Sequence, residues 1–152
     1  MIILGDAGIN MSNGLLDLRK KQMLLQFSMT LFCIHGNYEM RPNRVMQVDG
    51  WGGRINRKAY RLNDGHGGRV YVEAAFPSIL FSKDGEAYDL DGTETLVIRG
   101  TYSPDKPMCL ARGWPWFPDK QRDGRIRKRV EKVIKERQEK VDALLTHTIP
   151  AR

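Results

Sequence analysis

Residues 1–6 read Met-Ile-Ile-Leu-Gly-Asp, and residues 30–37 read Thr-Leu-Phe-Cys-Ile-His-Gly-Asn. Each stretch is a short apolar run that stops at a glycine and a polar side chain, which is typical of a buried strand ending in a loop. Between them, Ser12 or Asn13 can cap a helix that carries several apolar residues (Leu15, Leu16, Leu18, Met23 and Leu24). Strand, helix and strand within about 35 residues predict a βαβ unit, and hence a parallel sheet.

The middle of the chain has a different pattern. Asn43–Gly68 is rich in Gly, Arg and Asn and weakly periodic, which predicts a long functional loop or a small insertion. Short β-type runs follow, with hairpin turns at 83–86 and 91–92 between them. These runs are Val70–Ala74, Ile79–Ser82, Ala87–Leu90 and Thr95–Arg99. They predict a second, partly antiparallel sheet.

The last third begins with an aromatic and proline-rich stretch, Pro104–Pro118, which we expect to be a loop anchored by Trp114, Trp116 and Phe117. A basic helix follows, and Val141–Thr146 makes one more strand, which ends at His147. The predicted fold class is therefore α/β: a mostly parallel sheet and a second, more antiparallel sheet, flanked by helices.

The composition is that of one globular domain spanning residues 1–152, with 41% hydrophobic and 28% charged residues. No window approaches the ~20 apolar residues of a membrane span. The N-terminus lacks the basic region of a signal peptide, and two cysteines, Cys33 and Cys109, make no disulfide framework. We therefore expect a cytoplasmic protein with no membrane partner.

The formal charge of +7 is concentrated in residues 120–140, which hold ten basic and four acidic residues. One interpretation is a contact with nucleic acid or another acidic surface. The other is the solvated face of an amphipathic helix docked on a sheet. Acidic residues are interleaved regularly and the polar face has no aromatic residue, which favours the docked helix.

Three polar residues follow predicted strands directly: Asp6, Asn37 and His147. In open α/β sheets, ligands bind in the crevice outside the carboxyl ends of the strands. A carboxylate, an amide oxygen and an imidazole that meet there form a plausible metal site. The alternative is that the Gly-Asp and Gly-Asn pairs are ordinary turns and that the histidine has a structural role.

At these residues the sequence resembles the calcineurin-like metallophosphoesterase superfamily, in its phage and bacterial branch. Ile2–Asp6 matches the family's strand followed by Gly-Asp, Gly36–Glu39 nearly matches its Gly-Asn-His-Glu block, and Leu145–Thr148 matches its strand-end histidine. Phe81–Gly85 and Ala111–Trp114 are also phrases of that branch. The resemblance implies a sandwich of two mixed β-sheets flanked by helices.

The resemblance also implies a phosphoric-ester hydrolase that uses two divalent ions. Asp6 would bridge both ions, while Asn37 and His147 would bind the second. The family's Asp-x-His and Gly-His-x-His blocks are absent, so the fold is expected to be incomplete and at most one ion (Mn, Fe, Zn or similar) to bind. Tyr38 stands where the family has a catalytic histidine, and a tyrosine is a poorer proton donor at neutral pH. Weak or absent hydrolysis of an unidentified phosphoester is expected.

Two other classes of function stay open: a non-catalytic binding module that uses the basic helix within residues 120–140, and a non-functional gene fragment. Arg41 is either a phosphate-binding residue beside Asn37 or a surface salt-bridge partner. Among the remaining residues, we expect His35 to support the site residues or to be structural, and His66 to lie in a turn. We expect Cys33 to lie in the core. Trp51, Trp114 and Trp116 either stack on a substrate base or anchor the core or loops, and anchoring is the commoner role.

Overall fold

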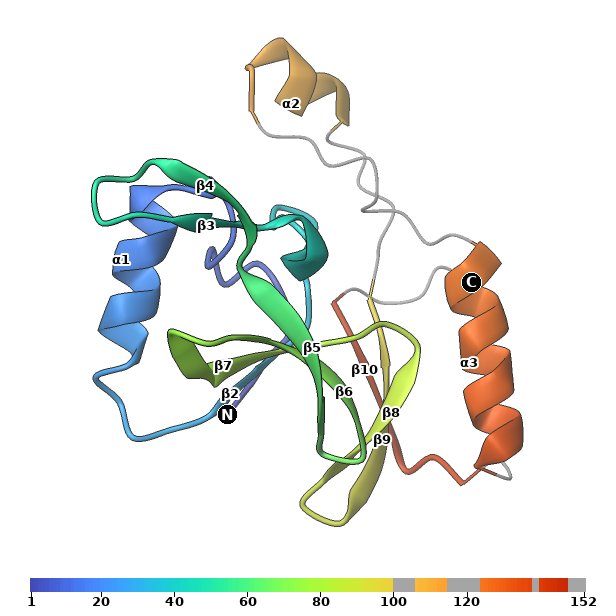
Figure 1. Ribbon diagram of the computed structural model, residues 1–152. Coiled ribbons are helices and arrows are strands. Elements are labelled where there is room, and N and C mark those ends of the chain that lie inside the picture. Colours follow the sequence, from blue (N-terminus) through green and yellow to red (C-terminus); the bar gives the residue numbers. More distant parts are fainter. Residues whose placement is uncertain (100–105, 115–123, 138–139, 148–152) are drawn as a thin grey trace.

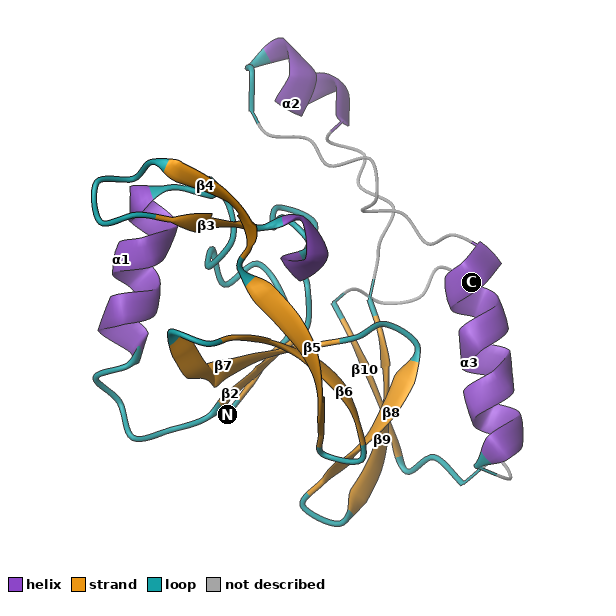
Figure 2. Ribbon diagram, viewed as in Figure 1, coloured by secondary structure: helices purple, strands orange, loops and turns teal. Residues whose placement is uncertain are grey.

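The computed structural model describes residues 1–99, 106–114, 124–137 and 140–147. Within these residues the protein is a mixed α/β fold with three sheets. Two longer helices lie on opposite sides of the molecule in Figure 1, and Figure 2 shows most of the strands gathered between them. No helix within the described residues is long and apolar enough to cross a membrane.

The first sheet has five strands in the order β1-β2-β7-β6-β5: β1 (Ile2–Ile3), β2 (Leu31–Cys33), β7 (Phe76–Ser82), β6 (Gly68–Glu73) and β5 (Tyr60–Gly65). Strands β1 and β2 are parallel neighbours joined through helix α1 (Leu15–Leu24), so the βαβ prediction is confirmed. Strand β7 is parallel to β2, whereas β6 and β5 add antiparallel pairings. The expectation of a mostly parallel sheet was therefore wrong, because the antiparallel strands β5 and β6 belong to this sheet.

The second sheet contains β8 (Glu86–Leu90), β9 (Thr93–Ile98) and β10 (Ala143–Thr146) in the order β10-β9-β8. Strands β8 and β9 form the hairpin expected at Asp91-Gly92, where both residues have positive φ. Strand β10 is parallel to β9. The turn at 83–86 is not a hairpin, because it carries the chain from β7 in the first sheet to β8 in the second.

The two sheets enclose part of the core. The side chains of β2 alternate between two apolar clusters. Leu31 and Cys33 belong to the first cluster. Phe32 belongs to the second, together with Tyr88 of β8 and Val97 of β9. Burial of both faces explains why the sequence of β2 is continuously apolar rather than alternating. Cys33 is fully buried, as expected, and burial, with a smaller contribution from the Glu39 charge, raises the pKa of its thiol to about 12.

The stretch 43–68, expected to be a long loop or a small insertion, is largely β-structure. A short 3-10 helix, η1 (Pro42–Arg44), precedes a two-stranded ribbon of β3 (Met46–Val48) and β4 (Arg54–Lys58), and β5 follows. Strand β4 is exposed along its whole length. Because neither face of β4 is buried, its sequence has no apolar–polar alternation, and the periodicity that identifies a half-buried strand was missing.

Helix α1 begins after Gly14, not at a Ser12 or Asn13 cap. The Asp17 carboxylate instead accepts hydrogen bonds from the backbone N–H groups of Ser12 (2.9 Å) and Asn13 (2.6 Å), which fixes the loop before the helix. The helix buries Asp17 and Lys21, while Leu16 and Met23 are exposed.

The other helices are α2 (Lys106–Ala111) and α3 (Gly124–Glu136). Helix α2 replaces part of the loop expected at 104–118. Trp114 beyond it is 47% exposed and lies against the Arg112 guanidinium, whereas Trp116 and Phe117 lie outside the described residues. Helix α3 packs on the second sheet through buried Ile126 and through Val130, which lies close to Gly85, so the docked amphipathic helix is confirmed for residues 124–136.

Candidate metal centre

The three polar residues at strand ends lie together. Asp6 follows β1, Asn37 follows β2 and His147 follows β10, which belongs to the other sheet. The His147 Nε2 atom lies 2.9 Å from Asn37 Oδ1 and 3.2 Å from Asp6 Oδ2. The side chains of His147 and Asp6 are 12% and 28% exposed, so the cluster is partly shielded from solvent.

The other ring nitrogen fixes the tautomer of the histidine. His147 Nδ1 lies 2.6 Å from the backbone carbonyl oxygen of Leu4. A carbonyl only accepts hydrogen bonds, so Nδ1 must donate. Nε2 then faces two oxygen atoms, of which the carboxylate can only accept. Such a group of one nitrogen and two oxygens is held together either by a proton on Nε2 or by a cation among the three atoms.

Two glycines make this approach possible. Gly5 has φ +98° and Asp6 has φ +52°, so the chain turns sharply at the end of β1. A Cβ atom on Gly5 would overlap the His147 ring, and one on Gly36 would overlap the Asp6 carboxylate. The Tyr38 N–H donates to Asp6 Oδ1 (2.9 Å) and orients that carboxylate.

The Glu39 side chain supports the loop that contains Gly36. Its carboxylate is fully buried and accepts hydrogen bonds from the N–H groups of Gly36 (3.2 Å) and Ile9 (3.3 Å). Burial raises the pKa of the Glu39 carboxyl; these two N–H groups oppose the shift, and the nearby Asp6 charge adds to it. In the sequence, Glu39 stands out only as the last residue of a family phrase, because its burial has no local signal.

The structure also places the remaining predicted residues. Arg41 is buried, and its Nη1 donates to the Gly36 carbonyl oxygen (3.4 Å), so it does not lie on the surface. His35 is buried and stacked on Phe81, and burial together with the charges of Arg41 and Arg99 holds its pKa well below the usual value. His35 therefore lies in the core, which agrees with the structural role expected of it.

The donor set of the cluster fits one divalent ion. A carboxylate, an amide oxygen and a neutral imidazole nitrogen are ligands that Mn²⁺, Fe²⁺ and Zn²⁺ accept. No group of three His, Cys, Asp or Glu side chains converges within the described residues, and the third polar side chain of this cluster is the Asn37 amide.

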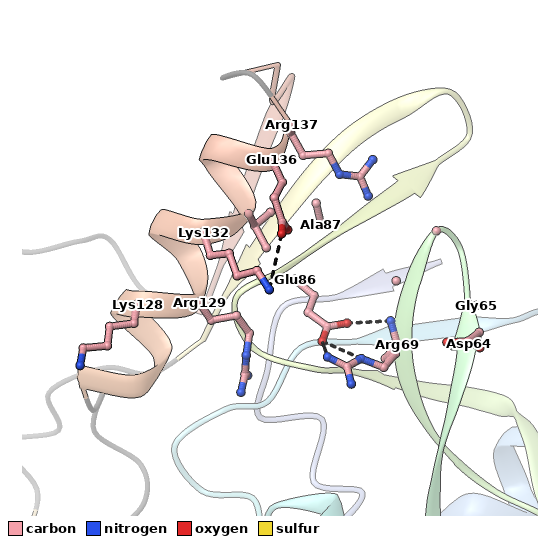
Figure 3. Close-up of a pocket in the computed structure, with 13 residues that line it drawn as sticks. Asp64, Gly65, Arg69, Glu86, Ala87, Lys128, Arg129, Lys132, Glu136 and Arg137 are labelled. Atoms are coloured by element: carbon pink, nitrogen blue, oxygen red, sulfur yellow. Dashed lines mark hydrogen bonds and ion pairs between the residues drawn. The ribbon is translucent and has the colours of Figure 1, made fainter.

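Helix α3 and the β5–β6 hairpin border a separate cleft of about 750 Å³ (Figure 3). His66 and Gly67 form the turn of that hairpin, both with positive φ, as the turn interpretation of His66 predicted. Glu86 lies at the cleft and accepts hydrogen bonds from Arg69 (2.6 Å) and Lys83 (2.7 Å). Burial alone would raise the pKa of Glu86, but these bonds outweigh it and leave the pKa below its usual value.

Two of the cations that border this cleft are paired with acidic groups. Lys132 forms an ion pair with Glu136 (Figure 3) at 3.5 Å, and Arg137 lies 3.0 Å from Glu94. Arg129 donates to the backbone carbonyl of Asp84 (2.7 Å). Helix α3 nevertheless keeps a positive excess, because it holds six basic and two acidic residues. Residues 120–123 and 138–139 of the basic segment lie outside the described residues.

The fold and the cluster together define a mixed α/β protein with an Asp–Asn–His group at the ends of three strands. Comparison with known proteins adds no identity: no family model, no curated protein and no solved structure matches the chain.

Proposed function

We propose that this protein is a metal-dependent phosphoric-ester hydrolase of the calcineurin-like metallophosphoesterase type, with one divalent ion and weak activity. One observation carries the proposal: the Asn37 Oδ1 and Asp6 Oδ2 atoms both lie within 3.2 Å of His147 Nε2. Nδ1–H donates its hydrogen bond to the Leu4 carbonyl, so in the neutral ring the Nε2 lone pair is available to an ion.

A bound divalent ion supplies positive charge to a phosphate oxygen and makes bound water more acidic. Three protein ligands leave coordination positions open for water and substrate, which is how catalytic sites differ from structural ones. Apart from holding the ion, the chain supplies few groups that would assist the reaction. Arg41 is turned to the Gly36 carbonyl, and Tyr38 offers a neutral hydroxyl where the resembling family has a histidine. We therefore expect slow turnover.

The first experiment is titration of the metal-free protein with Mn²⁺ by calorimetry. We expect one site, and we expect His147→Ala and Asp6→Asn each to weaken binding more than about 10-fold, because loss of supporting groups alone typically costs 10–100-fold. His66→Asn is the matched control: this exposed histidine lies in a hairpin turn, and asparagine tolerates its positive φ. Unchanged affinity in His147→Ala would contradict the site.

The second experiment measures hydrolysis of an aryl phosphodiester with Mn²⁺ present. We expect a rate at least about 100-fold below that of an intact metallophosphoesterase, because proton donation to a leaving group is typically worth ~10²–10⁴-fold. The remaining rate should disappear in Asp6→Asn. A rate that Asp6→Asn leaves unchanged would remove the hydrolase part of the proposal, and a rate within tenfold of an intact enzyme would show that the site is more complete than we propose.

A further inference from the structure

The β3–β4 ribbon presents the most exposed aromatic side chain among the described residues. Trp51, in the turn between β3 and β4, is 94% exposed, so the expectation that it anchors the core or a loop was wrong. Every residue of β4 is also exposed, and Ile55 is 44% exposed. A large apolar ring left almost wholly in water is a feature that an interaction partner can bury.

The turn that carries Trp51 is held in place. The Asp49 carboxylate accepts hydrogen bonds from the N–H groups of Trp51 (2.9 Å) and Gly53 (2.8 Å). Gly52 has φ +90°, and a Cβ atom there would come within 3.1 Å of the Leu15 side chain at the start of α1. Trp51 is therefore displayed on an ordered turn that rests against α1.

The strands next to this turn are basic. Arg57, Lys58 and Arg61 are exposed, and no carboxylate of the described residues lies within ion-pair distance of any of them. The nearby Asp49 carboxylate is occupied by its own turn. On α3, two of the cations are held in ion pairs, Arg127 with Glu131 and Lys132 with Glu136, although the helix as a whole also has more basic than acidic residues. The three ribbon cations have no such pairing with a described carboxylate, so all three are available to an anionic ligand.

We propose that Trp51, Arg57, Lys58 and Arg61 form a binding site for single-stranded nucleic acid, which we term the basic ribbon. The cations would contact phosphates along the strand and the Trp51 ring would stack on a base, a combination that binds single strands without sequence preference. Cations spread along consecutive strands fit a linear polyanion, whereas one tryptophan offers little apolar area to a bilayer. The basic ribbon contains none of the residues of the metal cluster, so this inference does not rest on the proposed function.

The test is fluorescence anisotropy with a labelled 20-nucleotide oligothymidylate at low salt, with EDTA present so that no metal chemistry contributes. We expect dissociation constants in the range of ~10⁻⁴–10⁻⁶ M. Trp51→Ala should weaken binding about 5- to 150-fold, which corresponds to the loss of one stacked base. Trp114→Ala, at a tryptophan that is 47% exposed outside the ribbon, should leave binding unchanged.

Two double variants that lose the same charge separate the effect of the basic ribbon from the effect of net charge. Arg57→Ala/Lys58→Ala should weaken binding and reduce the slope of log K against log salt by about 1.4, as expected for two phosphate contacts to a single strand. Lys128→Ala/Lys132→Ala removes the same charge from α3, on the opposite side of the molecule in Figure 1, and should change binding much less. Unchanged melting temperatures would show that all variants fold.

Four results would overturn the proposal. These are equal losses in the two double variants, unchanged binding in Trp51→Ala, equal affinity for a blunt duplex, and no binding of the oligonucleotide together with Trp51-dependent binding to anionic phospholipid vesicles. The last result would assign the basic ribbon to a membrane surface instead. None of these outcomes bears on Mn²⁺ binding by the Asp6 cluster.

Discussion

Replacement of Lys21 by methionine is expected to destabilise the protein by about 3–5 kcal/mol, the usual effect of removing one partner of a buried ion pair. Lys21 Nζ lies 2.6 Å from Glu73 Oε2, and the two side chains are only 5% and 13% exposed. The pair joins α1 to β6 in the first sheet. Without Lys21, the Glu73 carboxylate stays in a largely buried position with no compensating charge.

The lysine is also enclosed by aromatic rings. Its Nζ lies 5.0 Å from the centroid of Tyr60 and 5.7 Å from that of Phe76. Methionine keeps most of the packing against these rings, so the expected loss reports on charge rather than on volume. Urea denaturation measures this loss in the free energy of unfolding. Arg19→Met, an exposed position on the same helix, removes an equal charge and should change the free energy of unfolding by no more than about 0.5 kcal/mol.

The double variant Lys21→Met/Glu73→Met separates the two contributions. Since replacing both partners of a buried pair by apolar residues is often neutral or stabilising, the double variant should be more stable than Lys21→Met alone. Strictly additive losses from the two substitutions would show that Glu73 is well solvated without its partner, contrary to this account.

The second large effect is expected for Gly36→Ala, which should abolish Mn²⁺ binding and lower the free energy of unfolding by about 1–3 kcal/mol. A methyl group on Gly36 would overlap the Asp6 carboxylate and backbone nitrogen. Either strand end must then move, and Asp6 can no longer reach His147 Nε2 with Asn37 in place. Calorimetry measures the metal affinity and urea denaturation the stability.

Gly50→Ala is the control for this substitution. At Gly50 no atom lies within 4 Å of the position that a methyl group would take, and φ is not positive, so alanine should be tolerated there without loss of metal binding. If Gly36→Ala bound Mn²⁺ as tightly as the unaltered protein, the close contact of the two strand ends would not be needed for the site.

Several elements were predictable because their cause is local. The apolar run of β2 and the Gly-Asn after it indicate a buried strand and its end, and the Asp91-Gly92 pair indicates a hairpin turn. Helix α3 was recognisable from its apolar spacing, which buries Ile126 and brings Val130 to Gly85. In each case the residues concerned sit within one element or one turn, so the pattern is complete in the printed sequence.

Other elements were not predictable for physical reasons. Strand β4 has no buried face, and α1 buries the polar residues Asp17 and Lys21 because their partners lie elsewhere, on the preceding loop and on β6. The sheet to which β6 and β7 belong depends on pairing with β2, and no feature of β6 or β7 alone distinguishes that pairing. Pairing partners are a long-range property that propensity does not encode.

For the site, the sequence alone determined which residues end strands: Asp6, Asn37 and His147 follow apolar runs, and the resemblance to metallophosphoesterases rests on those positions. Only the tertiary structure decided that they meet. His147 is 110 residues from Asn37 and 143 from Leu4, and β10 reaches them from a different sheet. The direction in which Nε2 points is set by the Leu4 carbonyl, a backbone group common to every residue type, so no side-chain pattern could have indicated it.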